Sequence, residues 1–248
     1  MHHFFVEKEQ ISDSTVSITG PDVRYMTQVL RMKKGEQLQI SAGDEWEYTC
    51  RIREIGAKEI LADIEDIQKA GRELPSRIVL FQCIPKGEKM EWILQKAVEL
   101  GAAEIVPVMS ERCIVRLDEK KAASRTKRWN AVALSAARQS KRLQIPEVLP
   151  PMSWKDAMAY AAALDVRLMP YECAEGMEGT RKLLQGITPG QSIAVLIGPE
   201  GGFSEKEVSE AESEGFQTLT LGGRILRTET AGMTMLSILM YLLEDDAG

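Results

Sequence analysis

Ile193–Glu207 reads IAVLIGPEGGFSEKE, an apolar run followed by a glycine-rich turn and a helix start. The run Ser192–Ile197 is typical of a strand that is buried on both faces, as in a parallel sheet. Ser204 and Glu207 have the spacing of a capping box, which predicts the helix start. Glycines at the carboxyl end of such a strand let the backbone approach a ligand closely. The spacing matches neither a Walker A loop nor a G-x-G-x-x-G fingerprint, so taken alone it is better explained as a structural turn.

A second segment, Leu221–Ala231 (LGGRILRTETA), repeats this order of strand, glycines and helix. Thr228 is the expected N-cap of the last helix. Arg224 and Arg227 lie between the glycines and the helix, which is a suitable place for an anion or base clamp. A single arginine there is more typical of a surface ion pair. Two glycine loops at strand ends close in the sequence favour a binding site over two structural turns.

The chain after Pro75 alternates between strands and helices, which predicts a mostly parallel sheet covered on both faces. The expected strands are Ile78–Cys83, Ile105–Val108, Asp165–Met169, Ser192–Ile197 and Thr218–Leu221. The expected helices are Lys89–Leu100, Glu119–Arg142, one beginning at Ser153, a short one near Thr180–Leu184, Glu205–Glu214 and Glu229–Glu244.

The first seventy residues indicate a small β-rich unit with one short helix, Asp22–Met32. Short strands separated by turn signals predict a closed or nearly closed barrel. These strands are expected at His3–Val6, Thr15–Ile18, Gln37–Ser41, Glu47–Glu54 and Ile60–Ile67. The polar stretch Gln68–Pro75 is the natural linker, so we expect domains at residues 1–72 and 73–248.

The composition is that of a globular protein, with 44% hydrophobic and 27% charged residues. The longest apolar stretch, Ala231–Leu243, is too short to span a bilayer, so we expect no membrane segment. The four cysteines, at positions 50, 83, 113 and 173, form no C-x-x-C pair, and the two histidines are adjacent. We therefore expect no metal site and no disulfide framework, and reduced thiols in a cytoplasmic protein.

The net charge of −6 is by itself unfavourable for binding a nucleic acid. The charge is unevenly distributed along the chain, however. Residues 75–150 hold 14 basic and 8 acidic side chains, a net of +6 (14 − 8). Ten of these basic residues lie in Arg112–Arg142. Such a concentration is typical of a phosphate-binding surface, and equally of a solvated helix face.

The two glycine segments together strongly resemble those of the RsmE-type 16S rRNA uridine methyltransferases of the SPOUT superfamily. The resemblance covers nearly the whole chain. Further blocks that carry it are VLRMKKGE (Val29–Glu36), PKGEKMEWILQKAVELG (Pro85–Gly101), SER (Ser110–Arg112) and RWNAVALSAARQSKRLQIPEV (Arg128–Val148).

This resemblance implies a PUA-like β-barrel that binds RNA, followed by an α/β domain whose chain forms a trefoil knot, an exception to the rule against threaded chains. It also implies S-adenosyl-L-methionine (AdoMet) as cofactor and a homodimer. The implied reaction is methylation of N3 of one uridine, position 1498 in the customary numbering, in 16S rRNA of the small ribosomal subunit.

The resemblance also implies the cofactor site. The first loop supplies Gly198, Pro199, Glu200, Gly201 and Gly202, and the second supplies Leu221, Gly222, Ile225, Leu226 and Thr230. Met169, Pro170 and Glu172, at the end of an earlier strand, add a third edge.

Catalysis of this reaction needs stabilisation of the developing uracil anion, for which Arg227 is the first candidate and Arg224 the second. Glu200 and Glu229 are candidate proton acceptors, although Glu229 is better explained by its helix dipole. Candidate phosphate contacts are Arg31, Lys86, Lys89, Arg112, Arg128 and Arg142. Two alternatives stay open: a non-catalytic RNA-binding assembly factor, and a knotted methyltransferase that acts on another RNA such as tRNA.

Three positions depart from the family pattern. His2 and His3 stand where relatives carry basic residues, Arg24-Tyr25 where they tend to carry His, and Arg138 where they tend to carry Glu. None of these positions lies in the AdoMet loops.

Overall fold

The computed structural model describes residues 1–172 and 176–244, and the chain forms two compact units. The first unit comprises Met1–Glu73 together with Ala137–Ile145. The second comprises Leu74–Ala136 and the described chain from Pro146 onward. The end of a long helix thus belongs to the first unit, although it is distant in sequence. The domain division at residues 72 and 73 stays a prediction.

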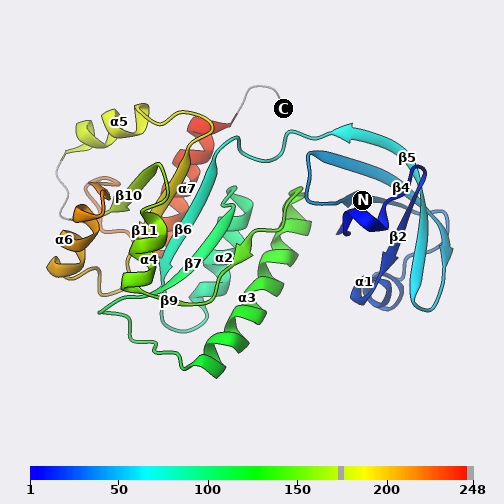
Figure 1. Cartoon of the computed structure of the whole chain (residues 1–248), viewed down its shortest axis with the longest axis horizontal. Coiled ribbons are helices and arrows are strands. Elements are labelled where there is room, and N and C mark those ends of the chain that lie inside the picture. Colours follow the sequence, from blue (N-terminus) through cyan, green and yellow to red (C-terminus); the bar gives the residue numbers. More distant parts are fainter. Residues whose placement is uncertain (173–175, 245–248) are drawn as a thin grey trace. The chain divides into compact units, whose positions relative to one another are not determined.

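The first unit contains a curled five-stranded sheet (Figure 1). Its strand order is β1 (His2–Phe5), β3 (Gln37–Ser41), β4 (Trp46–Ile55), β5 (Glu59–Lys69) and β2 (Thr15–Thr19). Only the β1–β3 pair is parallel. The β4–β5 register shifts at Thr49/Cys50 and at Ile52/Glu54, and such bulges bend and twist a sheet. Alternate residues of the strands are buried and form this unit's core, so the predicted β-rich unit is confirmed.

The helix expected at Asp22–Met32 is shorter than predicted. α1 (Pro21–Arg24) passes into a π-helical turn, η2 (Tyr25–Val29). Arg31 then takes a left-handed backbone conformation, with φ 54°, which ends the helix. The predicted end at Met32 was therefore wrong.

His3 is a core residue of the first unit. Its side chain is buried on β1, and its Nε2 lies 2.8 Å from the Ser41 hydroxyl on β3. Burial lowers the pKa of His3 to about 4, so the ring is neutral at physiological pH. His3 therefore presents no positive charge to a ligand.

Arg138 joins the last turn of the long helix to the first unit. Its Nη2 donates to both carboxylate oxygens of Asp22 at 2.7 Å. Its guanidinium also lies over two aromatic rings, 5.5 Å from the Phe4 centroid and 5.8 Å from that of Tyr25. Two of the departures from the family pattern, at positions 25 and 138, are thus in contact with each other.

The second unit is built on a parallel sheet, as predicted. Its order is β12 (Gln217–Leu219), β10 (Val166–Pro170), β11 (Ser192–Ile197), β6 (Arg77–Cys83), β7 (Glu104–Met109) and β8 (Glu147–Val148), and β9 (Met152–Ser153) also pairs with β7. The predicted bounds of β11 are confirmed. All strands point the same way, so their carboxyl ends meet at one edge of the sheet.

Helices cover both faces of this sheet (Figure 1). They are α2 (Lys89–Glu99), α3 (Glu119–Ser140), α4 (Trp154–Ala161), α5 (Met177–Gln185), α6 (Glu205–Ser213) and α7 (Thr228–Leu243). α4 and α6 pack on the face that carries Val79, Phe81 and Cys83. α2 and α7 pack together on the opposite face, where Gly232 of α7 lies close to Gln82. The predicted α/β architecture is confirmed.

Membrane-spanning helices, metal sites and disulfides were not expected, and the structure bears on them only for the described residues. Within residues 1–172 and 176–244, no helix is long and apolar enough to cross a membrane. No group of three or more His, Cys, Asp or Glu in the same ranges is placed to hold a metal ion. Cys50, Cys83 and Cys113 are buried free thiols, whereas Cys173 lies outside the described residues.

Candidate active site at the carboxyl ends of the strands

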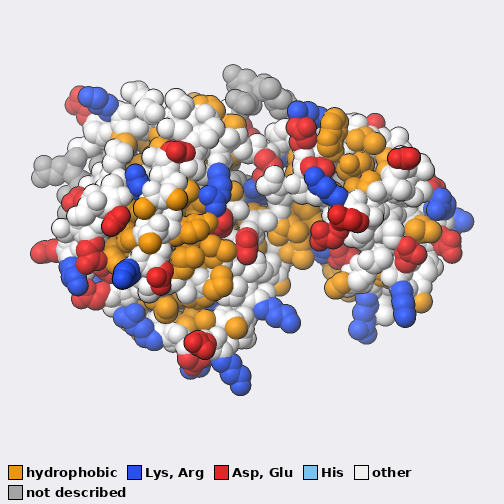
Figure 2. Space-filling view, viewed as in Figure 1, with side chains coloured by type: hydrophobic (Ala, Val, Ile, Leu, Met, Phe, Trp, Pro, Cys, Tyr) orange, Lys and Arg blue, Asp and Glu red, His pale blue; other side chains and the backbone are white. Residues whose placement is uncertain are grey.

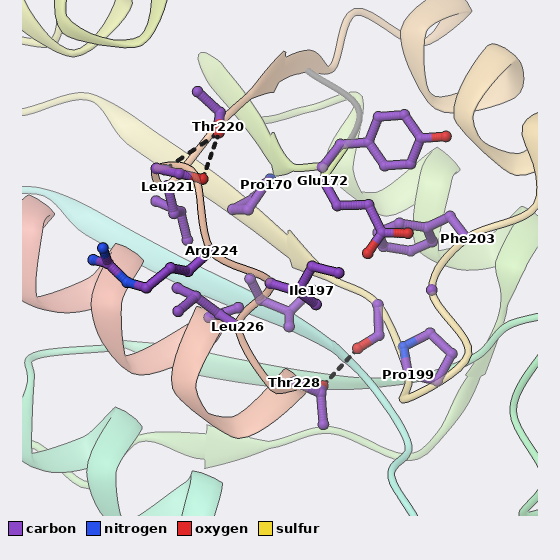
Figure 3. A pocket seen from close by; sticks show the side chains of 16 residues that line it. Pro170, Glu172, Ile197, Pro199, Phe203, Thr220, Leu221, Arg224, Leu226 and Thr228 are labelled. Atoms are coloured by element: carbon purple, nitrogen blue, oxygen red, sulfur yellow. Dashed lines mark hydrogen bonds between the residues drawn. The ribbon is translucent and has the colours of Figure 1, made fainter. Parts of the chain in front are cut away.

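A pocket opens at the carboxyl ends of β10, β11 and β12 and is closed on one side by the first turn of α7 (Figure 3). Most of the residues expected to bind the cofactor meet there. Those that line the pocket are Pro170, Glu172, Gly198, Pro199, Gly202, Leu221, Gly222, Ile225 and Leu226. The pocket is further lined by Tyr171, Ile197, Phe203, Thr220, Arg224, Thr228 and Ala231. Arg224 was expected as a catalytic residue. The other additional residues lie within the two glycine segments or adjoin an expected cofactor residue, so this nearness in sequence is the signal that would have found them.

Four expected cofactor residues do not line this pocket. Met169 is wholly buried in the apolar core between the sheet and α4 and α6. A Cβ on Gly201 would face the Arg112 side chain at 3.3 Å. Glu200 turns toward α2, and Thr230 lies on α7 outside the pocket lining.

Two glycines of the pocket take backbone conformations that side chains disfavour. Gly202 has φ 66° and Gly222 has φ 112°. A Cβ on Gly198 would come within 3.1 Å of the Phe203 ring, so backbone and ring are in close contact there. Because these positions carry no side chain, the loop backbone can approach a small ligand in the pocket closely.

The segment after β7 braces the first glycine loop. The predicted capping box of α6 is confirmed, and Glu207 also accepts a hydrogen bond from the Glu111 backbone N–H at 2.7 Å. Ser204 Oγ donates to the Glu111 carboxylate at 2.8 Å. Arg112 Nη1 donates to the Gly201 carbonyl at 2.9 Å. Arg112, expected to contact RNA, therefore holds a loop, a role that its sequence position did not reveal.

Lys89, at the start of α2, joins the two candidate proton acceptors. Its Nζ lies 3.1 Å from Glu200 Oε1 and 3.4 Å from Glu229 Oε2. Partial burial raises the pKa of Glu200, but hydrogen bonds from backbone N–H groups and from Lys89 outweigh it and leave the pKa below its usual value. The Lys86 backbone N–H is one of these donors, at 3.2 Å. Glu200 is therefore a weak proton acceptor.

The two candidate catalytic arginines differ in position. Arg224 lines the pocket, and its guanidinium points away from Glu172 and Phe203 (Figure 3). Arg227 is exposed and occupies the N-cap position of α7, so the prediction of Thr228 as N-cap was wrong. Neither guanidinium makes an ion pair within the described residues, which leaves both charges available to a ligand.

The expected phosphate contacts are dispersed. On the face drawn in Figure 2, basic side chains are interspersed with acidic ones. Arg31 and Lys86 are exposed, and Arg128 stays 63% exposed while its Nε lies 2.6 Å from Glu91. Arg142 is only 5% exposed and is bound to Glu73 in the first unit. We correct its assignment, because a buried, paired arginine is not free to meet a phosphate.

Two family models match the chain. The RNA methyltransferase domain matches residues 72–240, and the RNA methyltransferase PUA domain matches residues 18–65. The first match alone spans more than half of the chain.

Named relatives extend this similarity over the full length. Ribosomal RNA small subunit methyltransferase E of Bacillus subtilis is 34% identical over 98% of both chains. The crystal structure of the Neisseria gonorrhoeae protein of that name, bound to S-adenosyl methionine, has a TM-score of 0.84 at 35% identity over 98% of both chains. The structure of a putative methyltransferase of Legionella pneumophila with bound SAM has a TM-score of 0.85 at 34% identity over 96% of both chains. The chain belongs to the RsmE-type family of ribosomal RNA small subunit methyltransferases.

Proposed function

We propose that this protein transfers a methyl group from AdoMet to N3 of one uridine, position 1498 in the customary numbering, in 16S rRNA of the small ribosomal subunit. The observation that carries the proposal is the pocket between two glycine loops at the carboxyl ends of the parallel strands. The relative from Neisseria gonorrhoeae, which shares this fold, is described as bound to S-adenosyl methionine. Because the substrate is part of the ribosome, we propose that the enzyme acts in the cytoplasm.

The residues present in the pocket fit AdoMet. Apolar walls from Ile197, Leu221 and Leu226 suit the adenine ring, and the lack of a side chain at Gly222 lets the backbone approach its polar edge. Glu172 contributes a carboxylate that lies among the lining residues and is suited to hydroxyl or ammonium groups (Figure 3). Bound there, AdoMet would supply an electrophilic methyl group.

The protein's own part in the reaction is positioning and electrostatics. In-line transfer needs the uracil N3 held in the path of the methyl group, which contributes to rate by orientation alone. N3 loses its proton as it reacts, so the ring acquires negative charge. Arg227 is the first candidate to stabilise that charge, because its guanidinium makes no ion pair with any described residue and its backbone adjoins the pocket-lining residues Leu226 and Thr228. Arg224 is the second. Glu200 and Glu229, which both lie beside Lys89, are the candidate acceptors of the N3 proton.

RNA contact is assigned to exposed basic side chains of both units. Among the expected phosphate contacts, exposed side chains are found at Arg31 in the first unit and at Lys86, Arg112 and Arg128 in the second. Arg112 also donates to the Gly201 carbonyl. Phosphate contacts of this kind position an RNA without reading its sequence.

AdoMet binding is expected to depend on the space beside Ala231 and Gly222. Ala231 lines the pocket from the first turn of α7, where a helix accepts any side chain without backbone strain. We expect Ala231→Phe to fill the pocket and weaken AdoMet binding by at least about tenfold, or about 1.4 kcal/mol. Gly222→Val is expected to do the same, with added strain at its φ of 112°. Isothermal titration calorimetry measures both. Gly201→Ala is the control, since its Cβ faces Arg112, and wild-type affinity in both pocket variants would contradict the assignment.

A homodimer is proposed from the last helix. One stripe of α7 is buried in its own chain, including Met235, Leu236 and Leu239. Tyr241 stays 82% exposed and Leu242 42%, and both border an apolar groove between α5 and α7. A single chain therefore does not bury this helix completely, and a second copy is the proposed cover.

The dimer is tested by mass. Light scattering at micromolar concentration is expected to give twice the chain mass of 27.6 kDa. Tyr241→Glu with Leu242→Glu places two charges in the groove and is expected to give monomers, whereas Tyr241→Phe keeps the dimer. A monomeric wild-type protein would count against the proposal.

A further inference from the structure

Gln82 is a polar residue at the centre of an apolar sheet. It lies on β6 between Phe81 and Cys83, and its exposed fraction is 0%. Its side chain is on the face covered by α7, where a Cβ on Gly232 would lie 3.5 Å from Gln82 Oε1. A buried amide costs free energy unless it forms hydrogen bonds, so this position requires an explanation.

The Gln82 amide begins a directed chain of hydrogen bonds. Its Nε2 donates to Thr228 Oγ1 at 2.9 Å. A hydroxyl has one hydrogen, and Thr228 gives it to the Gly198 carbonyl at 2.5 Å. The direction is therefore fixed from β6 through α7 to the loop after β11. A threonine hydroxyl that both accepts and donates is needed in the middle, and an N–H donor is needed at position 82.

This chain connects the two loops that form the pocket. Gly198 begins the first loop, and Thr228 follows the second as the first residue of α7. Both residues line the pocket. The N-cap residue Arg227 makes no side-chain capping bond, so the Thr228 hydroxyl takes over the anchoring of this helix start. Arg227 itself directly precedes Thr228 in the chain.

The amide is unfavourable for stability in one respect. Gln82 Oε1 is buried and has no hydrogen-bond partner among the described residues. Such an unpaired acceptor is costly, and an apolar side chain of similar volume would fill the same space without it. The Nε2 donor is thus the feature of Gln82 that packing alone does not require.

We propose that Gln82 and Thr228 are positioning residues for methyl transfer: their hydrogen-bond chain fixes the spacing of the two pocket loops and the placement of Arg227. The inference rests on the proposed function, because it concerns the geometry of that reaction. Neither residue needs to touch the reacting atoms. Their effect passes through the Gly198 carbonyl and through the backbone that joins Thr228 to Arg227.

The test compares Thr228→Val with Thr228→Ser and adds Gln82→Met, which keeps the volume and removes the donor. We expect Thr228→Val and Gln82→Met each to lower kcat about tenfold to a hundredfold, the effect of a small misplacement. AdoMet affinity, measured by calorimetry, should fall less. Thr228→Ser should recover kcat to within about twofold of wild type, since it restores the hydroxyl. The double variant should be no slower than the slower single variant, because both changes break one chain.

Ile78→Val, at the other end of β6, is the matched control. It removes a buried methylene from the same strand, so it lowers the unfolding temperature without changing kcat. If Thr228→Val keeps the wild-type kcat and AdoMet affinity, or if the losses of kcat add in the double variant, this inference is overturned and the proposed function still stands. A wild-type protein that neither binds AdoMet nor methylates small-subunit rRNA would overturn the proposed function and, with it, this inference.

Discussion

Replacing Arg227 with alanine is expected to slow the chemical step about a hundredfold or more, as removal of an oxyanion-type donor does. Arg227 precedes the first turn of α7 and borders the pocket-lining residues Leu226 and Thr228. Its guanidinium forms no ion pair within the described chain, so its charge is not offset by a carboxylate. AdoMet affinity should change little, because the side chain does not line the cofactor pocket.

Single-turnover methylation at saturating RNA separates catalysis by Arg227 from substrate binding. Arg227→Lys should recover part of the rate, since a point charge does not reproduce the planar guanidinium. Arg224→Ala is the matched control from the same loop and should have the smaller effect, because its guanidinium points away from Glu172 and Phe203 (Figure 3). An Arg227→Ala enzyme that regains the full rate when RNA is raised would mean that Arg227 only holds the substrate.

Arg142→Ala is expected to destabilise the protein by about 3–5 kcal/mol, the usual result of removing one partner of a buried ion pair. The Arg142 side chain is 6% exposed, and its Nε and Nη2 both donate to the Glu73 carboxylate. Glu73 also accepts from the backbone N–H groups of Leu143 and Gln144, at 2.8 and 3.2 Å. The variant leaves this carboxylate partly buried without its cation.

Arg128→Ala is the matched comparison on the same basic segment. Its pair with Glu91 is exposed, so its loss should change the free energy of unfolding by no more than about 1 kcal/mol. It should instead flatten the salt dependence of RNA binding by about one unit of slope. Denaturant unfolding and RNA titrations at several salt concentrations measure the two effects. Equal stability of the two variants would contradict the structural role of Arg142.

The alternation of strands and helices allowed the parallel sheet to be predicted, and the two glycine segments indicated a binding site at its carboxyl edge, because these signals are local. A buried strand, a glycine turn and a capping box occupy consecutive residues, and parallel strands bring their carboxyl ends together. β11 and α6 therefore lie where the sequence places them, and Gly198, Gly202 and Gly222 line one pocket.

The remaining features depend on contacts between distant residues, which no local pattern encodes. Arg112 bonds to Gly201, and Gln82 bonds to Thr228 across 146 positions of sequence. In the sequence, nothing distinguishes Arg142 from the other arginines of the basic segment, because its partner Glu73 is 69 positions away. The trefoil knot and the target uridine stay predictions from the family resemblance.

The central claim is that this protein methylates N3 of one uridine in small-subunit rRNA. The most direct measurement combines the purified protein, AdoMet with an isotopically labelled methyl group, and small subunits from cells that lack the protein. The rRNA is then digested and mapped by mass spectrometry. The account predicts one labelled methyl group on N3 of uridine 1498 in 16S rRNA, and none when Arg227→Ala is used for the same short time. Label on another nucleotide, label on tRNA only, or no label from a protein that binds AdoMet would contradict it.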